Sequence, residues 1–112
     1  MNFLYFDELE VAITVCNREG LIVYMNRKSI QNFAADGGDA LVGKSLLDCH
    51  PEPARSKLAD LLANPRRNIY TIEKNGLKKM IYQLPWTEDG NFKGLIEFSL
   101  PLPEEIPHFV RG

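Results

Sequence analysis

The sequence predicts an α+β domain in which a five-stranded antiparallel β-sheet carries short helices on one face. Two strand-like runs lie on either side of a turn at positions 17–20, and a helical pattern follows them directly. Three more strand-like runs follow one another at 68–74, 77–86 and 94–100, after a longer helical pattern. Joining both sets of strands in one sheet, covered by the helices, is the simplest way to bury the apolar residues.

The segment 12–34 predicts the first two strands and the first helix. Asn17 and Gly20 bound a turn in which they can supply positive φ angles, and apolar, β-branched runs precede and follow it. The second run stops at Asn26, a residue type that caps helices well, and Ile30 and Phe33 follow at helical spacing. We therefore expect a helix over 27–34, capped by the Asn26 side chain, and a cost of about 1 kcal/mol for Asn26→Ala.

The middle of the chain predicts irregular turns followed by the longest helix. Two glycines at 37–38 break the first helix, and the apolar residues within 41–47 are enough for short, inward-packed helical turns. Pro53 suits the first turn of a helix from about 53 to 64, which ends at Asn64-Pro65. The apolar side of this helix should pack inward; it consists of Ala54, Leu58, Leu61 and Leu62.

The last three strands form a predicted meander. Asn75-Gly76 is a strong hairpin signal, and the connection 87–93 contains a second turn dipeptide, Asp89-Gly90. In the middle strand one face is apolar, and we expect it to face the helices; it carries Met80, Tyr82, Leu84 and Trp86. By the same alternation we place Ile81 and Ile96 on the outer face of the sheet.

Length and composition limit the organisation and the partners. The 112 residues suit a chain with one domain. We place this domain at 11–100, between a flanking segment at 1–10 with the pattern of an amphipathic helix and a proline-containing tail at 101–112. The net charge of −2 and the scattered basic residues do not favour nucleic acid, and no apolar run is long enough to span a membrane. The acidic N-terminus lacks the pattern of a secretory signal, so we expect a cytoplasmic protein with Cys16 and Cys49 reduced.

The sequence offers no pattern typical of an enzyme or a metal site. The serines lack a nucleophile elbow, and neither a phosphate loop nor a GxGxxG motif is present. The metal-binding patterns CxxC and HxxxH are also missing. We expect neither catalysis nor a metal centre.

The ordered motifs of this chain resemble those of the PAS family. The turn at 17–20 resembles the family's turn between its first two strands, and Tyr24-Met25-Asn26 resembles its aromatic, apolar, Asn signature. The segment 43–47 is similar to the family's Gly-x-x-apolar step, and His50-Pro51-Glu52 to its His-Pro-acidic turn before the long helix. Gly94 opens the last strand of the meander, so the resemblance covers residues 11–100. It implies a sensory or regulatory module with a cavity between the helices and the inner sheet face.

The resemblance further implies that the cavity holds a small molecule and that the module signals through protein–protein contacts. On this basis we assign the expected cavity to Phe33, Leu46, Cys49, His50, Leu58, Leu62, Tyr70, Tyr82 and Trp86. The alternative is a module with a filled core that binds no ligand and acts through dimerisation or other protein contacts. The size of the cavity separates these two hypotheses.

The cofactor stays unknown at this stage. Cys49 and His50 could each supply an axial ligand to haem, but a small apolar role for the thiol and a turn-fastening role for the imidazole explain them as well. Haem-binding members usually take their ligand from the long helix, and the segment 53–64 has no His, Cys or Met. Flavin adduct chemistry is disfavoured because Leu46 stands where the flavin-binding relatives carry their reactive cysteine.

The N-terminal segment predicts a contact with a second copy. Its apolar side, which includes Phe3, Leu4 and Phe6, is more than a short helix can bury against its own domain. We therefore expect a homodimer whose interface joins these residues to Ile81 and Ile96 on the outer sheet face. The alternative is a segment that folds back over its own sheet or frays.

Overall fold

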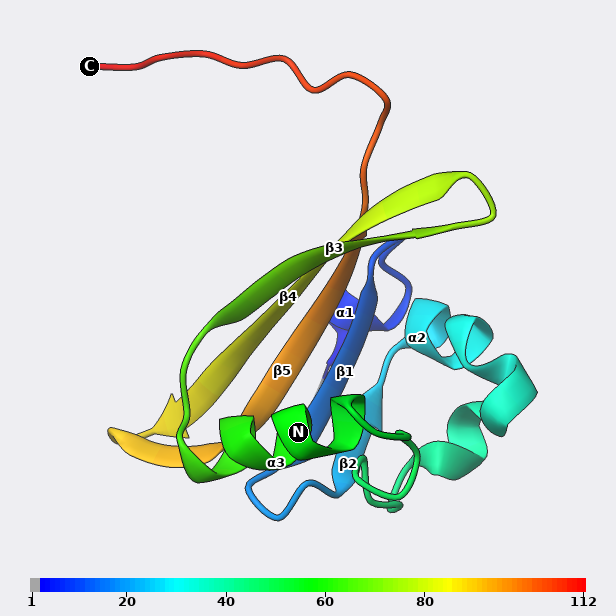
Figure 1. The fold of residues 1–112 in the computed structure, drawn as a ribbon, viewed down its shortest axis with the longest axis vertical. Coiled ribbons are helices and arrows are strands. Elements are labelled where there is room, and N and C mark those ends of the chain that lie inside the picture. The colour runs from blue at the N-terminus through cyan, green and yellow to red at the C-terminus, as the bar shows by residue number, and fades with distance from the viewer. Residues whose placement is uncertain (1–2) are drawn as a thin grey trace.

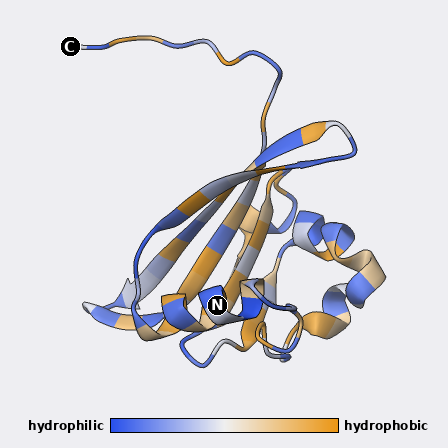
Figure 2. Cartoon of the chain, viewed as in Figure 1, coloured by the Kyte–Doolittle hydropathy of each residue, from blue (hydrophilic) through white to orange (hydrophobic). Residues whose placement is uncertain are grey.

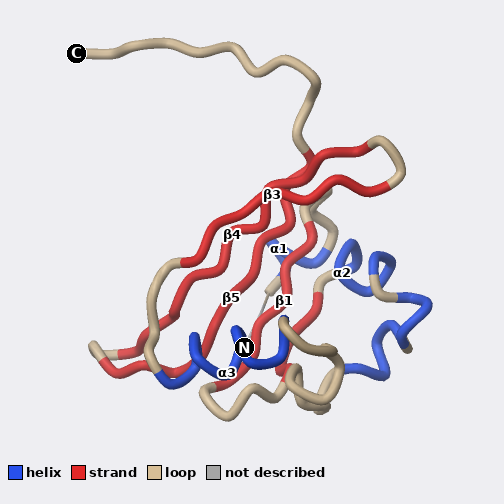
Figure 3. Tube along the Cα trace, in the orientation of Figure 1, coloured by secondary structure: helices blue, strands red, loops and turns tan. Residues whose placement is uncertain are grey.

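The structure is a computed structural model that describes residues 3–112, and within this range the chain forms one antiparallel sheet of five strands (Figures 1 and 3). The strand order is β2-β1-β5-β4-β3, which confirms the predicted five-stranded antiparallel sheet. The elements are α1 (Leu4–Asp7), β1 (Ala12–Asn17), β2 (Ile22–Met25), α2 (Arg27–Asn32), the 3₁₀ helices η1 (Ala34–Asp36) and η2 (Gly38–Leu41), α3 (Ala54–Ala63), β3 (Asn68–Lys74), β4 (Leu77–Glu88) and β5 (Asn91–Pro101). Among the helices of residues 3–112, none is long and apolar enough to cross a membrane.

The first hairpin and helix form as the sequence predicts. Asn17 stabilises the turn because its Oδ1 accepts hydrogen bonds from the backbone N–H groups of Glu19 and Leu21. Asn26 caps α2, since its Oδ1 accepts from the backbone N–H of Ser29. The helix ends at Asn32, two residues earlier than predicted, and the chain continues as the 3₁₀ turns η1 and η2.

The core lies between the sheet and the helices α2, η2 and α3. One cluster joins Cys16 of β1, Leu61 of α3 and Leu95 of β5. A second cluster joins Ile22 and Met25 of β2 to Leu41 of η2, with Ile30, Phe33 and Leu46 packed against it. Figure 2 shows hydrophobic residues along β1 and β5 in the middle of the sheet. The strands that carry most of the burial are therefore the central ones.

The prediction for the two faces of β4 is wrong. Directly paired residues share a face, and the registers Cys16↔Leu95 and Leu95↔Pro85 place Pro85 on the helix side, together with Ile81 and Gln83 by alternation. The apolar set of Met80, Tyr82, Leu84 and Trp86 lies on the other side. Alternation defines two faces of a strand but does not say which of them faces the helices.

The helix α1 lies on the side of the sheet opposite to α3. The ring centroids of Phe3 and Tyr24 lie 4.6 Å apart, and the Tyr24 hydroxyl donates a hydrogen bond of 2.5 Å to the Asp7 carboxylate. Tyr24 pairs with Val15, which points away from the helix side because Cys16 points toward it. Figure 1 shows α3 in front of the sheet, α1 behind it, and the tail after Pro101 extending away from the domain. Positions 1–2 of the predicted flanking segment lie outside the described residues.

Candidate functional site

A cavity of about 100 Å³ lies between the inner face of the sheet and the helices. Four strands, α3, both 3₁₀ turns and the loop before α3 contribute to its wall. The lining residues are Thr14, Cys16, Ile22, Met25, Phe33, Asp36, Leu41, Leu46, Cys49, His50, Leu58, Gln83, Leu95 and Glu97. Most of this wall is apolar, with a small number of polar groups, which is the usual composition of a small-molecule site.

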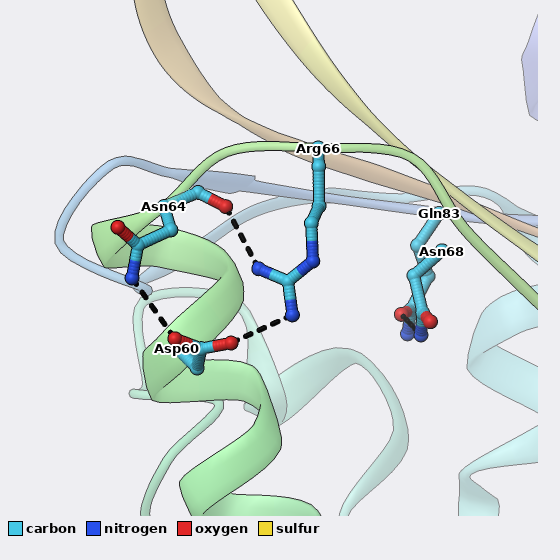
Figure 4. A network of polar contacts seen from close by, with 5 residues as sticks. All are labelled: Asp60, Asn64, Arg66, Asn68 and Gln83. Carbon is cyan, nitrogen blue, oxygen red and sulfur yellow. Dashed lines mark hydrogen bonds and ion pairs between the residues drawn. The ribbon is translucent and has the colours of Figure 1, made fainter.

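A row of polar side chains crosses the inner face of the sheet toward this cavity. The backbone register pairs Asn68 with Gln83 and Gln83 with Glu97. Asn68 Nδ2 donates to Gln83 Oε1 at 2.8 Å, as Figure 4 shows from close by, and Gln83 Nε2 donates to Glu97 Oε1 at 2.8 Å. The next residue in the row, Thr14, pairs with Glu97 and forms a 2.5 Å hydrogen bond to Ser29 of α2. The site therefore combines apolar walls with a polar row on four strands, in which Asn68, Gln83 and Glu97 are joined by hydrogen bonds.

Glu97 is the charged member of this row. Burial raises the pKa of its carboxyl above the ordinary value of 4.5, while the Gln83 hydrogen bond and the nearby His50 oppose that rise. No residue of the described chain donates a hydrogen bond to its second oxygen, Oε2, and no Lys or Arg within residues 3–112 forms an ion pair with it. The carboxyl thus has one fixed oxygen and one oxygen available to another group.

The loop before α3 places Cys49 and His50 in the cavity wall. The His50 Nδ1–H donates a hydrogen bond of 2.7 Å to the Leu46 carbonyl, which leaves Nε2 as the other polar atom of the ring. Cys49 is exposed, whereas the Cys16 thiol on β1 is buried and burial raises its pKa. Both cysteines are free thiols, and they line the same cavity from opposite walls.

The network at the C-terminal end of α3 fixes the entry of β3. Arg66 Nη2 lies 2.6 Å from Asp60 Oδ2, and Arg66 Nη1 donates to the Asn64 carbonyl (Figure 4). The Arg66 hydrogen bond lowers the pKa of the exposed Asp60 carboxyl. These contacts join the C-terminal end of α3 to the loop that leads into β3.

Haem does not fit the residues of this cavity. A volume of about 100 Å³ is far smaller than a porphyrin ring requires. None of the lining residues is Lys or Arg, so the wall offers no ammonium or guanidinium group to pair with haem propionates. Within residues 3–112, no group of three or more His, Cys, Asp or Glu side chains lies close enough together to hold a metal ion.

The structure brings together five of the nine residues assigned to the cavity from the sequence: Phe33, Leu46, Cys49, His50 and Leu58. Leu62 packs instead against the core cluster around Leu61, and the exposed ring of Tyr70 lies 5.9 Å from the Lys57 ammonium. Tyr82 and Trp86 point to the opposite side of the sheet because β4 presents its other face to the helices. Their assignment to the cavity is wrong for that reason.

Sequence reasoning missed the acids and amide of the site. Glu97 is the one charged residue of the predicted strand run 94–100, and this is the signal that could have drawn attention to it. Gln83 and Asp36 carry no comparable signal, since polar residues are common in strands with one solvated face and in loops.

The residues expected at a dimer interface do not form one surface. Ile81 is 5% exposed and lies on the helix side, paired with Ser99, so its assignment to the outer face is wrong. Ile96 pairs with Leu84 on the outer side and is half-buried. Phe3 packs on Tyr24, while Leu4 and Phe6 are exposed.

Comparisons with known proteins agree with this architecture. A family model described as the PAS fold matches residues 6–64, more than half of the chain. The PAS domain of Bordetella pertussis BvgS has a similar structure, with a TM-score of 0.67 and 24% identity over 90% of this chain and 83% of that chain. A C-terminal domain from Streptococcus mutans gives a TM-score of 0.71 at 19% identity, covering 88% of this chain and 80% of that chain.

The Aer2 receptor of Vibrio cholerae, described as a dual PAS-haem oxygen sensor, gives a TM-score of 0.56 at 22% identity over 83% of this chain and 95% of that chain. No match was found among curated protein sequences. At these identities the structural likeness shows the fold alone. The match over residues 6–64, together with the sheet, the capped helix α2 and the covered cavity, shows that this chain belongs to the PAS fold family.

Proposed function

We propose that this chain is a non-enzymatic sensory module that binds a small molecule in its cavity and passes the bound state on through protein contacts. The observation that carries the proposal is the cavity of about 100 Å³, in which the hydrogen-bonded row ending at Glu97 meets an apolar wall. A carboxyl group in a mostly apolar wall is unfavourable unless another group satisfies it. A filled core that serves packing alone would place an apolar residue at this position.

A variant that fills the cavity tests ligand binding. Leu58→Phe adds volume to the wall from α3, and Leu62→Phe is its matched control because Leu62 lies on the same helix outside the cavity wall. Purified protein is denatured, and the released small molecules are quantified by mass spectrometry. We expect a compound near one equivalent from the intact protein and from Leu62→Phe, and much less from Leu58→Phe. If the intact protein releases no such compound, and Leu58→Phe is at least as stable as the intact protein, the ligand-free interaction module is supported instead.

The outer face of the sheet supports the proposed protein contact. One row of directly paired residues on this side consists of Tyr24, Val15, Ile96 and Leu84. These side chains are half-buried, and α1 covers only the part beside Tyr24. We propose that a second copy of the chain covers the remainder and forms a two-fold dimer.

Light scattering tests the proposed dimer. Ile96→Asp places a charge in the middle of this row and should convert the dimer to a monomer, whereas Val42→Asp, at an exposed position after η2, should leave it unchanged. An intact protein that is monomeric at about 50 μM, a concentration at which a contact with a micromolar Kd would be occupied, contradicts the dimer.

A further inference from the structure

The charges of the cavity wall limit the chemical class of its ligand. Two carboxylates line it, Asp36 and Glu97, and the imidazole of His50 is the one basic side chain among the described lining residues. The sum of these groups is an acidic to neutral site. Such a wall disfavours carboxylate and phosphate ligands, because like charges in a partly buried site repel each other strongly.

The residues around Glu97 hold its carboxyl in a fixed orientation toward the cavity. Gln83 is 7% exposed, and its amide is fixed at both ends, since Oε1 accepts from Asn68 while Nε2 donates to Glu97 Oε1. Rotation of the Gln83 amide would break both hydrogen bonds. Glu97 is therefore held by one oxygen on a rigid strand row, and its Oε2 has no donor among residues 3–112.

No Lys or Arg of residues 3–112 forms an ion pair with this carboxyl, and His50 is the nearby side chain that can carry a positive charge. The ion pairs of the described chain involve exposed side chains outside the cavity or at its rim, and Glu97 is in none of them. Partial burial disfavours the ionised carboxyl, as the raised pKa of Glu97 shows. A ligand cation at Oε2 would offset this penalty and form a charge-assisted hydrogen bond.

The other walls favour an apolar body of limited size. Ile22, Met25, Phe33, Leu41 and Leu58 surround the remaining space, and none of these side chains can donate or accept a strong hydrogen bond. The volume of about 100 Å³ leaves room for a small molecule only.

We propose that the ligand is a small organic amine, with its ammonium group hydrogen-bonded to Glu97 and its apolar body against the β2, η2 and α3 walls. This inference rests on the proposed ligand-binding function and specifies the chemistry of the same site. Gln83 and Asn68 act as positioning residues, because their hydrogen bonds hold the Glu97 carboxyl in place.

Three probes with one apolar body test the charge preference: benzylamine, benzyl alcohol and benzoate. Their affinities are measured by NMR titration of backbone amide shifts on the intact protein near pH 7. We expect benzylamine to bind about tenfold or more tightly than benzyl alcohol, as is typical of a hydrogen bond between charged groups, and benzoate to bind most weakly. The shifts should centre on Thr14 and Glu97 of the sheet wall and on Leu58 of the α3 wall.

Glu97→Gln tests the carboxylate itself. This variant should lose about tenfold in benzylamine affinity and bind benzyl alcohol as before, whereas the control Asp36→Asn, which alters the other acid of the wall, should retain the amine preference. Equal binding of amine and alcohol by the intact protein, or an unchanged amine affinity in Glu97→Gln, overturns the inference and leaves ligand binding intact. Absence of cavity shifts with all three probes overturns the inference together with the proposed function. If Glu97→Gln fails to fold, the ranking of the three probes on the intact protein still decides.

Discussion

Replacing Asn26 by alanine should destabilise the protein far more than the loss of a helix cap. Asn26 is 1% exposed, and its Oδ1 accepts from the backbone N–H groups of Ser29 and Ile13 at 3.1 and 2.9 Å. Its Nδ2 donates to the carbonyls of Phe6 and Val11 at 2.9 and 2.8 Å. One side chain thus joins the N-terminal segment, β1 and α2.

The magnitude follows from these four hydrogen bonds. The cap contributes about 1 kcal/mol, and each further bond contributes about 0.5–1.5 kcal/mol, with an added penalty where a buried backbone group is left unpaired. We expect Asn26→Ala to lower the free energy of unfolding by about 3–5 kcal/mol, compared with the 1 kcal/mol that the sequence alone predicts. That is a large part of the stability of a typical domain.

Urea unfolding followed by circular dichroism measures this loss. At a slope of about 1.3 kcal/mol per M, the midpoint should fall by about 2–4 M. Asn32→Ala is the control, because Asn32 is exposed at the end of the same helix and its change should stay within about 0.5 kcal/mol. A loss below about 1.5 kcal/mol for Asn26→Ala would refute the bracing role inferred from the four bonds.

Three further predictions concern other parts of the fold. Gly94→Ala should lower the free energy of unfolding by about 2–4 kcal/mol in the same assay, because the added Cβ would lie 1.9 Å from the Cys16 carbonyl oxygen. Gly90→Ala is the control and should lower it less, because the space around Gly90 is open. Burial and Asp7 raise the pKa of Tyr24, so stability should fall as pH rises above about 10, and a pH series on Tyr24→Phe should lack this component. The pKa of Glu97 is also raised in the folded state, so this group stabilises the fold below its ordinary pKa of 4.5, and the contribution is lost as pH rises. The free energy of unfolding of Glu97→Gln, relative to that of the intact protein, should therefore increase from pH 4 to pH 8. A difference that stays constant over this range would contradict the prediction.

Local signals in the sequence were sufficient for the hairpins and the helix starts. Gly20 and Asn75 have positive φ angles of 86° and 53°, as predicted, whereas Asn17 stabilises its turn through side-chain hydrogen bonds and not through a positive φ. The Asn26 cap is likewise a property of residues close in sequence, apart from its three bonds to distant backbone groups. These features depend on backbone chemistry that does not change with the tertiary context.

The inner face of the sheet could not be predicted in the same way. Residues 80–86 alternate clearly, but the choice of the inward side depends on the pairing of β4 with β5, which joins Gln83 to Glu97. The sequence assigned the apolar side inward because burial usually favours it. In the structure the inward side of β4 carries Ile81, Gln83 and Pro85, and its apolar side lies on the outer face. The register with β5 thus decides the inward face, against the simplest packing argument.

Trp86, on the outer side of the sheet, is hydrogen-bonded to the backbone of a residue that lines the cavity. It is the single tryptophan of the chain, and its Nε1–H donates to the Cys16 carbonyl at 3.0 Å, next to Gly94. The thiol of that same cysteine lines the cavity. A molecule that presses on the Cys16 side chain acts on the carbonyl to which the indole is bonded. If a ligand binds as proposed, we expect the intrinsic fluorescence of the protein to change without an attached dye, because its emission comes from this one position in the fold.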